Sequence, residues 1–207
     1  MQRITRRTAA VLSSRRFGIA VLMFFVLEAV WIACSALYPM AFDEEFHFGL
    51  IKIYSQHWLP FFSSQPHGLG QFGPFVSDPS YLYHYLMSFP YRLLHVFTHS
   101  QTALVIVLRF MNIAFFSTGL LLFYRLLRRV GTSRLLANTA LALFVLIPIV
   151  PLLAGQINYD NLLFPLVAWT CLLVADAYGD IRKQRLNLKT LTVLVSLLML
   201  SSLVKYA

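Results

Sequence analysis

The chain has 207 residues, of which 58% are hydrophobic and only 12% are charged. Soluble domains carry roughly 25% charged residues, so this composition excludes a water-soluble fold. The formal net charge of +9 therefore does not indicate a nucleic-acid partner, and its placement along the chain is expected to orient the protein in a membrane.

Apolar blocks of about 20 residues, long enough to cross a bilayer, predict an all-α fold, a polytopic transmembrane helical bundle. A basic segment, residues 1–16, precedes the first block. About five spans are expected: Phe17–Leu37, Thr102–Tyr124, Leu135–Ala154, Leu162–Tyr178 and a helix from about Thr190 to the last residue, Ala207. Residues 101–207 then form one membrane domain, which we expect to continue in a longer protein.

A long loop, residues 38–100, separates the first two spans and is predicted to hold two interfacial helices, at about 43–57 and 80–98. Polar residues in the second helix recur every three or four positions and form one stripe. They are His84, Ser88, Arg92, His95 and His99. A helix with such a stripe either lies in the interface or packs its stripe into a polar cavity.

The basic residues decide whether residues 81–98 cross the membrane. Segments 1–16, 125–134 and 179–189 hold five, four and four Lys or Arg, together 13 of the 17. All three segments lie on the same side of the membrane only if residues 81–98 lie flat on its surface or form a re-entrant segment that does not cross it. The positive-inside rule then predicts a cytoplasmic N-terminus, with the long loop on the outer side of the membrane.

Three acidic residues and a histidine follow the first span, within the sequence Phe42–Phe48. Asp43 is well placed as a helix N-cap. His47 lies four residues after Asp43 and three after Glu44, so these side chains can meet on one helix face. A capped, solvated helix start is the alternative interpretation, although such a charged group at a membrane surface is costly unless it is used.

Three further polar segments are expected on the outer side, each with a simpler alternative. Gln156–Asn161 is a predicted outer turn, and Asn and Asp are ordinary turn residues. Asp78–His84 opens the second interfacial helix, and a proline-started helix with interfacial tyrosines explains it equally. Lys205 and Tyr206 end the last helix, where a lysine can simply snorkel to the interface.

Taken in order, these motifs resemble the GT-C superfamily of membrane glycosyltransferases, which use sugars on polyprenyl phosphate or related lipid carriers. The resemblance rests on Asp43-Glu44, the stretch Pro79–Tyr85, Arg109, Asn158 with Asp160, and Lys205-Tyr206. The pattern D-E-x-x-H-F, with Phe48 as its last residue, is similar to a family of bacterial GT-C-like membrane proteins. Asp78-Pro79-Ser80 stands where the superfamily usually has a double proline.

The resemblance implies an inverting sugar transfer at the outer face, with Asp43 and Glu44 as the catalytic residues. Asp43 would be the general base, and Glu44 would orient the acceptor. Asp43, Glu44 and His47 are also candidate ligands of a divalent cation, Mg²⁺ or Mn²⁺. The implied partners are a lipid-linked sugar donor and membrane lipids.

The same resemblance implies a set of substrate-binding residues. Arg109 and Lys205 would contact the lipid phosphate, and Asn158 with Asp160 would line the sugar pocket. The whole set is His47, Tyr81, His84, Arg109, Asn158, Asp160 and Lys205. Two other functions remain open from the sequence: a transporter or flippase of a cell-envelope precursor, and a non-catalytic membrane scaffold.

Overall fold

Helices, most of them apolar, make up most of the described chain, as the composition predicts. The computed structural model describes residues 2–40, 43–65, 70–73, 75–76, 80–185 and 187–205, and all regular structure within them is helical. The elements are α1 (Gln2–Leu12), α2 (Arg15–Ser35), α3 (Glu44–Ser55), the 3-10 turn η1 (Gly70–Phe72), α4 (Leu82–Phe97), α5 (Gln101–Arg129), α6 (Arg134–Val145), α7 (Ile149–Ala154), α8 (Asp160–Arg182) and α9 (Leu188–Val204).

Three helices, α2, α5 and α8, are long and apolar enough to cross a membrane. They correspond to the first, second and fourth predicted spans, as expected for an integral membrane protein. Serine caps two of them: the Ser14 hydroxyl accepts the backbone N–H of Phe17 at the start of α2, and the Ser100 hydroxyl accepts that of Ala103 at the start of α5.

The third and fifth predicted spans differ from continuous long helices. Residues 134–154 divide into α6, of 12 residues, and α7, of six. Pro148 lies at the break. It interrupts the helix because proline has no backbone N–H to donate and its ring clashes with the carbonyl four residues earlier. The last helix, α9, has 17 residues. Five membrane crossings therefore stay a prediction.

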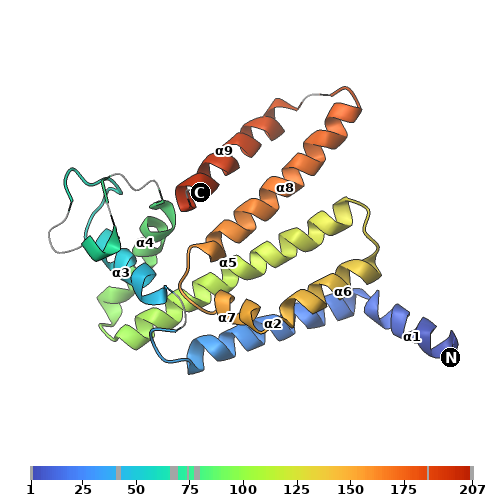
Figure 1. Ribbon diagram of the computed structural model, residues 1–207, viewed down its shortest axis with the longest axis horizontal. Coiled ribbons are helices and arrows are strands. Elements are labelled where there is room, and N and C mark those ends of the chain that lie inside the picture. Colours follow the sequence, from blue (N-terminus) through green and yellow to red (C-terminus); the bar gives the residue numbers. More distant parts are fainter. Residues whose placement is uncertain are drawn as a thin grey trace.

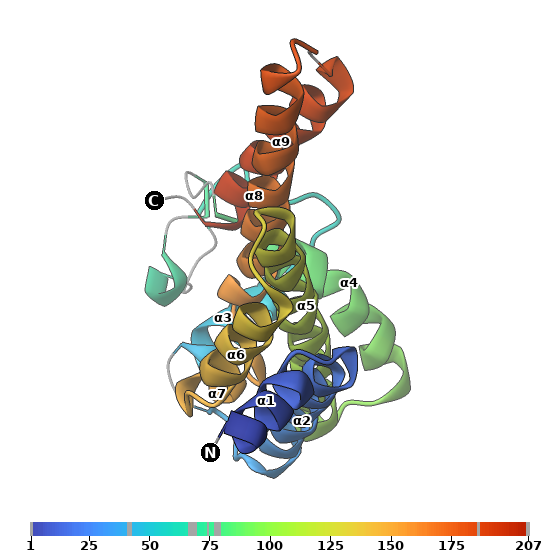
Figure 2. The same ribbon diagram turned by 90° about the vertical axis from the view of Figure 1, so that its right-hand side faces the viewer.

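The bundle is layered around α5, with α8 and α9 on one side and α2, α6 and α7 on the other (Figures 1 and 2). The α5–α8 contact is close at Gly119, where an added Cβ would lie 2.2 Å from Cδ1 of Phe164. On the other side of α5, Phe25 of α2 packs against Phe116, with ring centroids 5.6 Å apart. These contacts fix α5 as the central helix.

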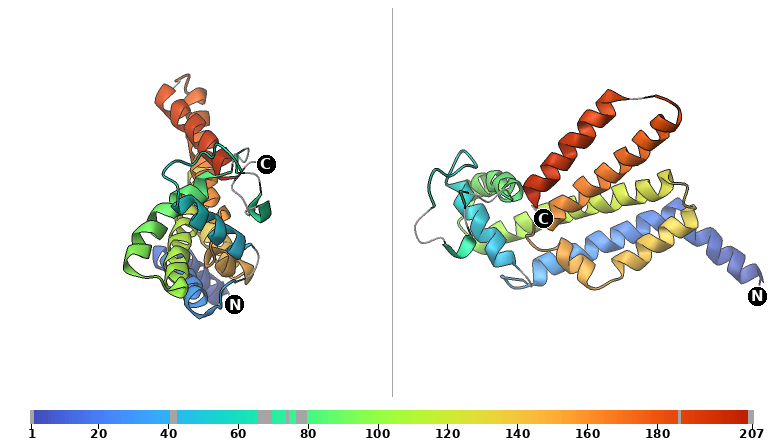
Figure 3. Two further views of the ribbon diagram at one scale, coloured as in Figure 1. Left: turned by 90° about the vertical axis from the view of Figure 1, so that its left-hand side faces the viewer. Right: turned by 45° about the horizontal axis from the view of Figure 1, so that its top comes forward.

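The two ends of the bundle differ in character. Helices α3 and α4, within the ranges predicted for interfacial helices, gather at the end where α2 finishes and α5 begins (Figure 3). The turn between α7 and α8 and the end of α9 lie at this same end, here called the loop end. The three basic segments lie at the opposite end (Figure 1).

The polar stripe predicted for residues 81–98 faces both the protein and solvent. His84 and Ser88 are buried, and His95 is exposed. His99 lies beyond the last residue of α4, Phe97. The first turns of α4 therefore pack their polar side chains inward against the rest of the loop end.

Candidate functional site

A buried ion pair lies at the centre of the loop end. Arg109, in the third turn of α5, is 1% exposed, and Glu44, in the first turn of α3, is fully enclosed. The pair is bidentate, with Arg109 Nε 2.8 Å from Glu44 Oε1 and Nη2 2.7 Å from Oε2. Arg109 Nη1 also donates to the carbonyls of Ala33 and Ala36, at 2.9 and 3.0 Å. The guanidinium thus satisfies carbonyls that the end of α2 leaves open.

The Glu44 carboxylate is fully engaged within the protein. Besides Arg109, it accepts the backbone N–H of Met40 at 2.6 Å and that of Ile157 at 3.2 Å. The pair therefore joins α2, α3, α5 and the turn before α8. The resemblance implied that Glu44 orients the acceptor and that Arg109 contacts the lipid phosphate. In the structure both side chains are enclosed and directed at each other.

Asn112, one turn after Arg109, organises a second buried network that the motifs did not reveal. Its Oδ1 accepts the Tyr83 hydroxyl at 2.9 Å, the backbone N–H of Asn158 at 3.3 Å and Asn161 Nδ2 at 3.0 Å. The one available signal was a polar side chain inside an apolar span, which normally faces a partner in the protein. This network positions the α7–α8 turn against α4 and α5.

His47 and His84, both predicted as substrate contacts, form a buried pair. His47 Nδ1 lies 2.9 Å from His84 Nε2, and the side chains are 2% and 3% exposed. A hydrogen bond from the His84 ring to the backbone of Ser80 uses the one N–H of the neutral imidazole. His47 Nδ1 then donates to His84, which leaves the lone pair on His47 Nε2. The Tyr159 ring packs edge-on against His47 at 4.7 Å.

Burial keeps both imidazoles neutral. It lowers the pKa of His47 to about 4, although the charges of Asp43 and Asp160 act in the opposite direction. Burial, together with the neighbouring His47, lowers the pKa of His84 well below its ordinary value. A neutral pair of this kind can hold a directed hydrogen bond at physiological pH.

The histidine pair predicts a loss of stability in acid. In the unfolded chain both residues titrate near pH 6.5, so between pH 6.5 and about 4 the unfolded state binds more protons than the folded state. The melting temperature in detergent should therefore fall across this window. A variant with His47→Gln and His84→Gln should lose less of its stability on acidification, and His99→Gln, at an exposed position, should behave as wild type. Equal pH profiles for all three proteins would contradict the buried neutral pair.

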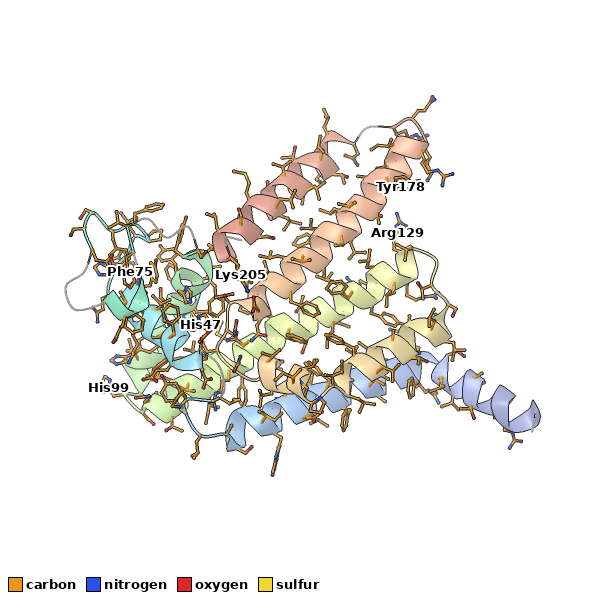
Figure 4. The ribbon with its side chains drawn as sticks, in the orientation of Figure 1. His47, Phe75, His99, Arg129, Tyr178 and Lys205 are labelled. Carbon is orange, nitrogen blue, oxygen red and sulfur yellow. The ribbon has the colours of Figure 1, made fainter. Side chains whose placement is uncertain are left out.

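Charged side chains from three separate segments act on Tyr159 or on the neighbouring His47 at the loop end. Lys205 Nζ lies 3.0 Å from Asp160 Oδ1 and 4.7 Å from the centre of the Tyr159 ring. Asp43 is exposed, and its charge, like those of Asp160 and Lys205, acts on His47. We call Asp43, His47, Asp160 and Lys205 the rim cluster. His47 and Lys205 lie near each other in Figure 4, far from Arg129 at the basic end.

Other predicted residues take supporting positions. Tyr81, half-buried just before α4, packs its ring against Phe61 at 5.6 Å. The Asn158 side chain accepts the backbone N–H of Asp160 at 2.8 Å, which shapes the start of α8. The predicted motif residues Phe42, Asp78, Pro79 and Tyr206 lie outside the described residues.

The three candidate metal ligands do not form a ligand set. Glu44 is engaged by Arg109, and His47 Nδ1 by His84. In the part of the chain that the structure describes, no group of three or more His, Cys, Asp or Glu side chains could hold a metal ion. The divalent cation stays a prediction of the resemblance, and no chemical step below depends on it.

Known proteins add nothing to this geometry. No family model, no curated protein and no solved structure matches the chain. The candidate site therefore rests on the residues, distances and burial given above.

Proposed function

We propose that the protein is a GT-C-type membrane glycosyltransferase that moves a sugar from a polyprenyl-phosphate carrier to an acceptor hydroxyl at the outer membrane face. The observation that supports this function is the rim cluster. The charge of an exposed carboxylate, Asp43, acts on His47, and so do the charges of a paired lysine and carboxylate from distant parts of the chain, Lys205 and Asp160. A base together with a cation is what transfer from a phosphate leaving group requires.

The proposed membrane arrangement has five crossings, in which α9 and the broken pair α6–α7 span the membrane beside α2, α5 and α8. The N-terminus is cytoplasmic, and the membrane is the bacterial plasma membrane. The concentration of Lys and Arg at the end opposite the rim cluster supports this orientation, because basic residues remain on the cytoplasmic side. The rim cluster then faces the outer leaflet.

In the proposed reaction the acceptor oxygen attacks C1 of the sugar while Asp43 takes the hydroxyl proton. The bond between C1 and the phosphate oxygen breaks, and the carrier phosphate leaves with the electron pair. Lys205 Nζ has three donors, of which Asp160 and the Tyr159 side chain engage two, so the third is available to the developing negative charge. Attack opposite the leaving phosphate inverts the configuration at C1.

Lys205→Gln tests the proposed role of the cation. With a polyprenyl-phosphate hexose labelled in the sugar, and a membrane extract as acceptor, we expect kcat to fall about 100-fold in proteoliposomes, since the leaving phosphate loses its charged donor. Lys189→Gln removes an exposed lysine at the opposite end and should leave the rate unchanged. Movement of the labelled lipid across the bilayer without sugar transfer would instead identify a flippase and overturn the proposed function.

A further inference from the structure

Four basic residues lie outside the three basic segments: Lys52, Arg92, Arg109 and Lys205. Arg109 and Lys205 are each paired with a carboxylate. Lys52 and Arg92 have no such partner within 4.0 Å among the described residues. Cations that have no carboxylate partner in the protein are candidates for binding an anion from outside the chain.

The two unpaired cations line the same cavity. It has a volume of about 370 Å³ and lies between the last turns of α3 and the last two turns of α4. His95 and two hydroxyl-bearing residues, Ser55 and Tyr91, share its wall with Lys52 and Arg92. No carboxylate is among the described residues that line it. The wall therefore offers positive charge and hydrogen-bond donors together.

Arg92 is held in place but only partly satisfied. Its Nη2 donates to the carbonyl of Tyr54, at 2.7 Å, and to that of His57. Its guanidinium lies over the rings of Trp58 and Phe89, 4.7 and 5.2 Å from their centres. Nε and Nη1 are buried with no hydrogen-bond partner among the described residues. Unsatisfied donors on a charged group cost free energy, which a neighbouring anion would offset.

An exposed apolar face of α4 borders the cavity. Its members recur at helical spacing and are Leu86, Phe89, Leu93, Val96 and Phe97. Leu93 is 64% exposed and Phe97 is 79% exposed. Val96 belongs to both this face and the cavity wall. Cations beside an apolar helix face are the arrangement that interfacial helices use on anionic membranes.

We propose that this cavity binds the phosphate of an anionic phospholipid whose acyl chains lie against the exposed apolar face of α4. Lys52 Nζ meets the phosphate oxygens, the positive charge of Arg92 in the cavity wall attracts them, and the Ser55 and Tyr91 hydroxyls meet the polar part of the headgroup. The site shares no residue with the rim cluster, so it stands apart from the proposed sugar transfer. Its ligand is a bulk membrane lipid that anchors α3 and α4 to the surface.

Lys52→Gln is the first test, because Lys52 is exposed and the change should leave the fold intact. The purified full chain is titrated with short-chain phosphatidylglycerol, short-chain phosphatidylcholine and inorganic phosphate. Wild type should bind phosphatidylglycerol about tenfold more tightly than phosphatidylcholine, and Lys52→Gln should lose about fivefold of the affinity for phosphatidylglycerol. Lys189→Gln makes the same change of net charge at the other end and should lose none.

Three outcomes of this titration overturn the proposal: equal affinity for the two lipids, equal loss in both lysine variants, or inorganic phosphate that binds as tightly as the lipid. The last would assign the cavity to a free anion. Leu93→Ser tests the placement of the acyl chains. It should weaken the binding of both lipids about tenfold and leave phosphate binding unchanged, because the leucine side chain would no longer be buried against the acyl chains. Unchanged lipid affinity in this variant would also overturn the proposal.

Discussion

Glu44→Gln is expected to destabilise the folded protein by about 3 to 5 kcal/mol, because Arg109 would keep its charge in an enclosed place without a carboxylate. Arg109 is 1% exposed and cannot turn to solvent without leaving the carbonyls of Ala33 and Ala36. The unfolding midpoint in a graded series of denaturing detergent measures the change. Since the pair joins four segments, the loss should appear as a single cooperative shift of that midpoint.

Glu45→Gln is the matched control, because Glu45 is the next residue in the same helix turn but is exposed. Its effect should stay within about 0.5 kcal/mol. A double variant, Glu44→Leu with Arg109→Leu, should recover much of the stability lost by Glu44→Gln, since it removes both buried charges. Equal midpoints for the Glu44 and Glu45 variants would show that the buried pair does not stabilise the fold.

Asp43→Asn is expected to lower kcat for sugar transfer by about 10²- to 10⁴-fold, the usual contribution of a general base. Asparagine has the same shape as aspartate but cannot accept the acceptor's proton. The fold should be unaffected, because Asp43 is exposed and its side chain makes no capping hydrogen bond at the start of α3. The transfer assay with the labelled polyprenyl-phosphate hexose gives the rate, and the unfolding midpoint reports the fold.

Glu45→Gln is again the control, since it removes a neighbouring exposed carboxylate without removing the proposed base. Its transfer rate should remain within about twofold of wild type, the range expected for a surface change that leaves the site intact. Undiminished transfer by Asp43→Asn would exclude Asp43 as the base. Loss of transfer in both variants would indicate that the acidic surface as a whole is needed, and would likewise remove the specific role of Asp43.

The helical fold could be predicted from the sequence because apolar runs dominate it. Helices α2, α5 and α8 begin within two residues of the predicted spans. The prediction of a single third span missed the break between α6 and α7, although Pro148 was a local signal for it. A hydropathy pattern reflects only how apolar the residues are. It does not show that a proline such as Pro148 lacks the backbone N–H that a continuous helix needs.

The candidate site was harder to predict, because its contacts join distant residues. Spacing within one helix suggested that His47 meets Asp43 or Glu44, whereas the structure pairs His47 with His84, 37 residues away. Glu44 meets Arg109, 65 residues away. Both pairs depend on how α3 packs against α4 and α5, which local periodicity does not determine. The sequence did indicate that polar groups would gather at one end.

The ion pair of Glu44 and Arg109 has a consequence for the order in which the protein is made. The end of α2 and the start of α3 leave the ribosome early. Apart from the N–H of Met40, the partners of their carbonyls and carboxylate lie on later segments, at Arg109 and at the N–H of Ile157. During synthesis these groups must stay hydrated until α5 has been inserted. Assembly of the loop end therefore follows insertion of the spans, and it can be completed only after residue 157 has left the ribosome.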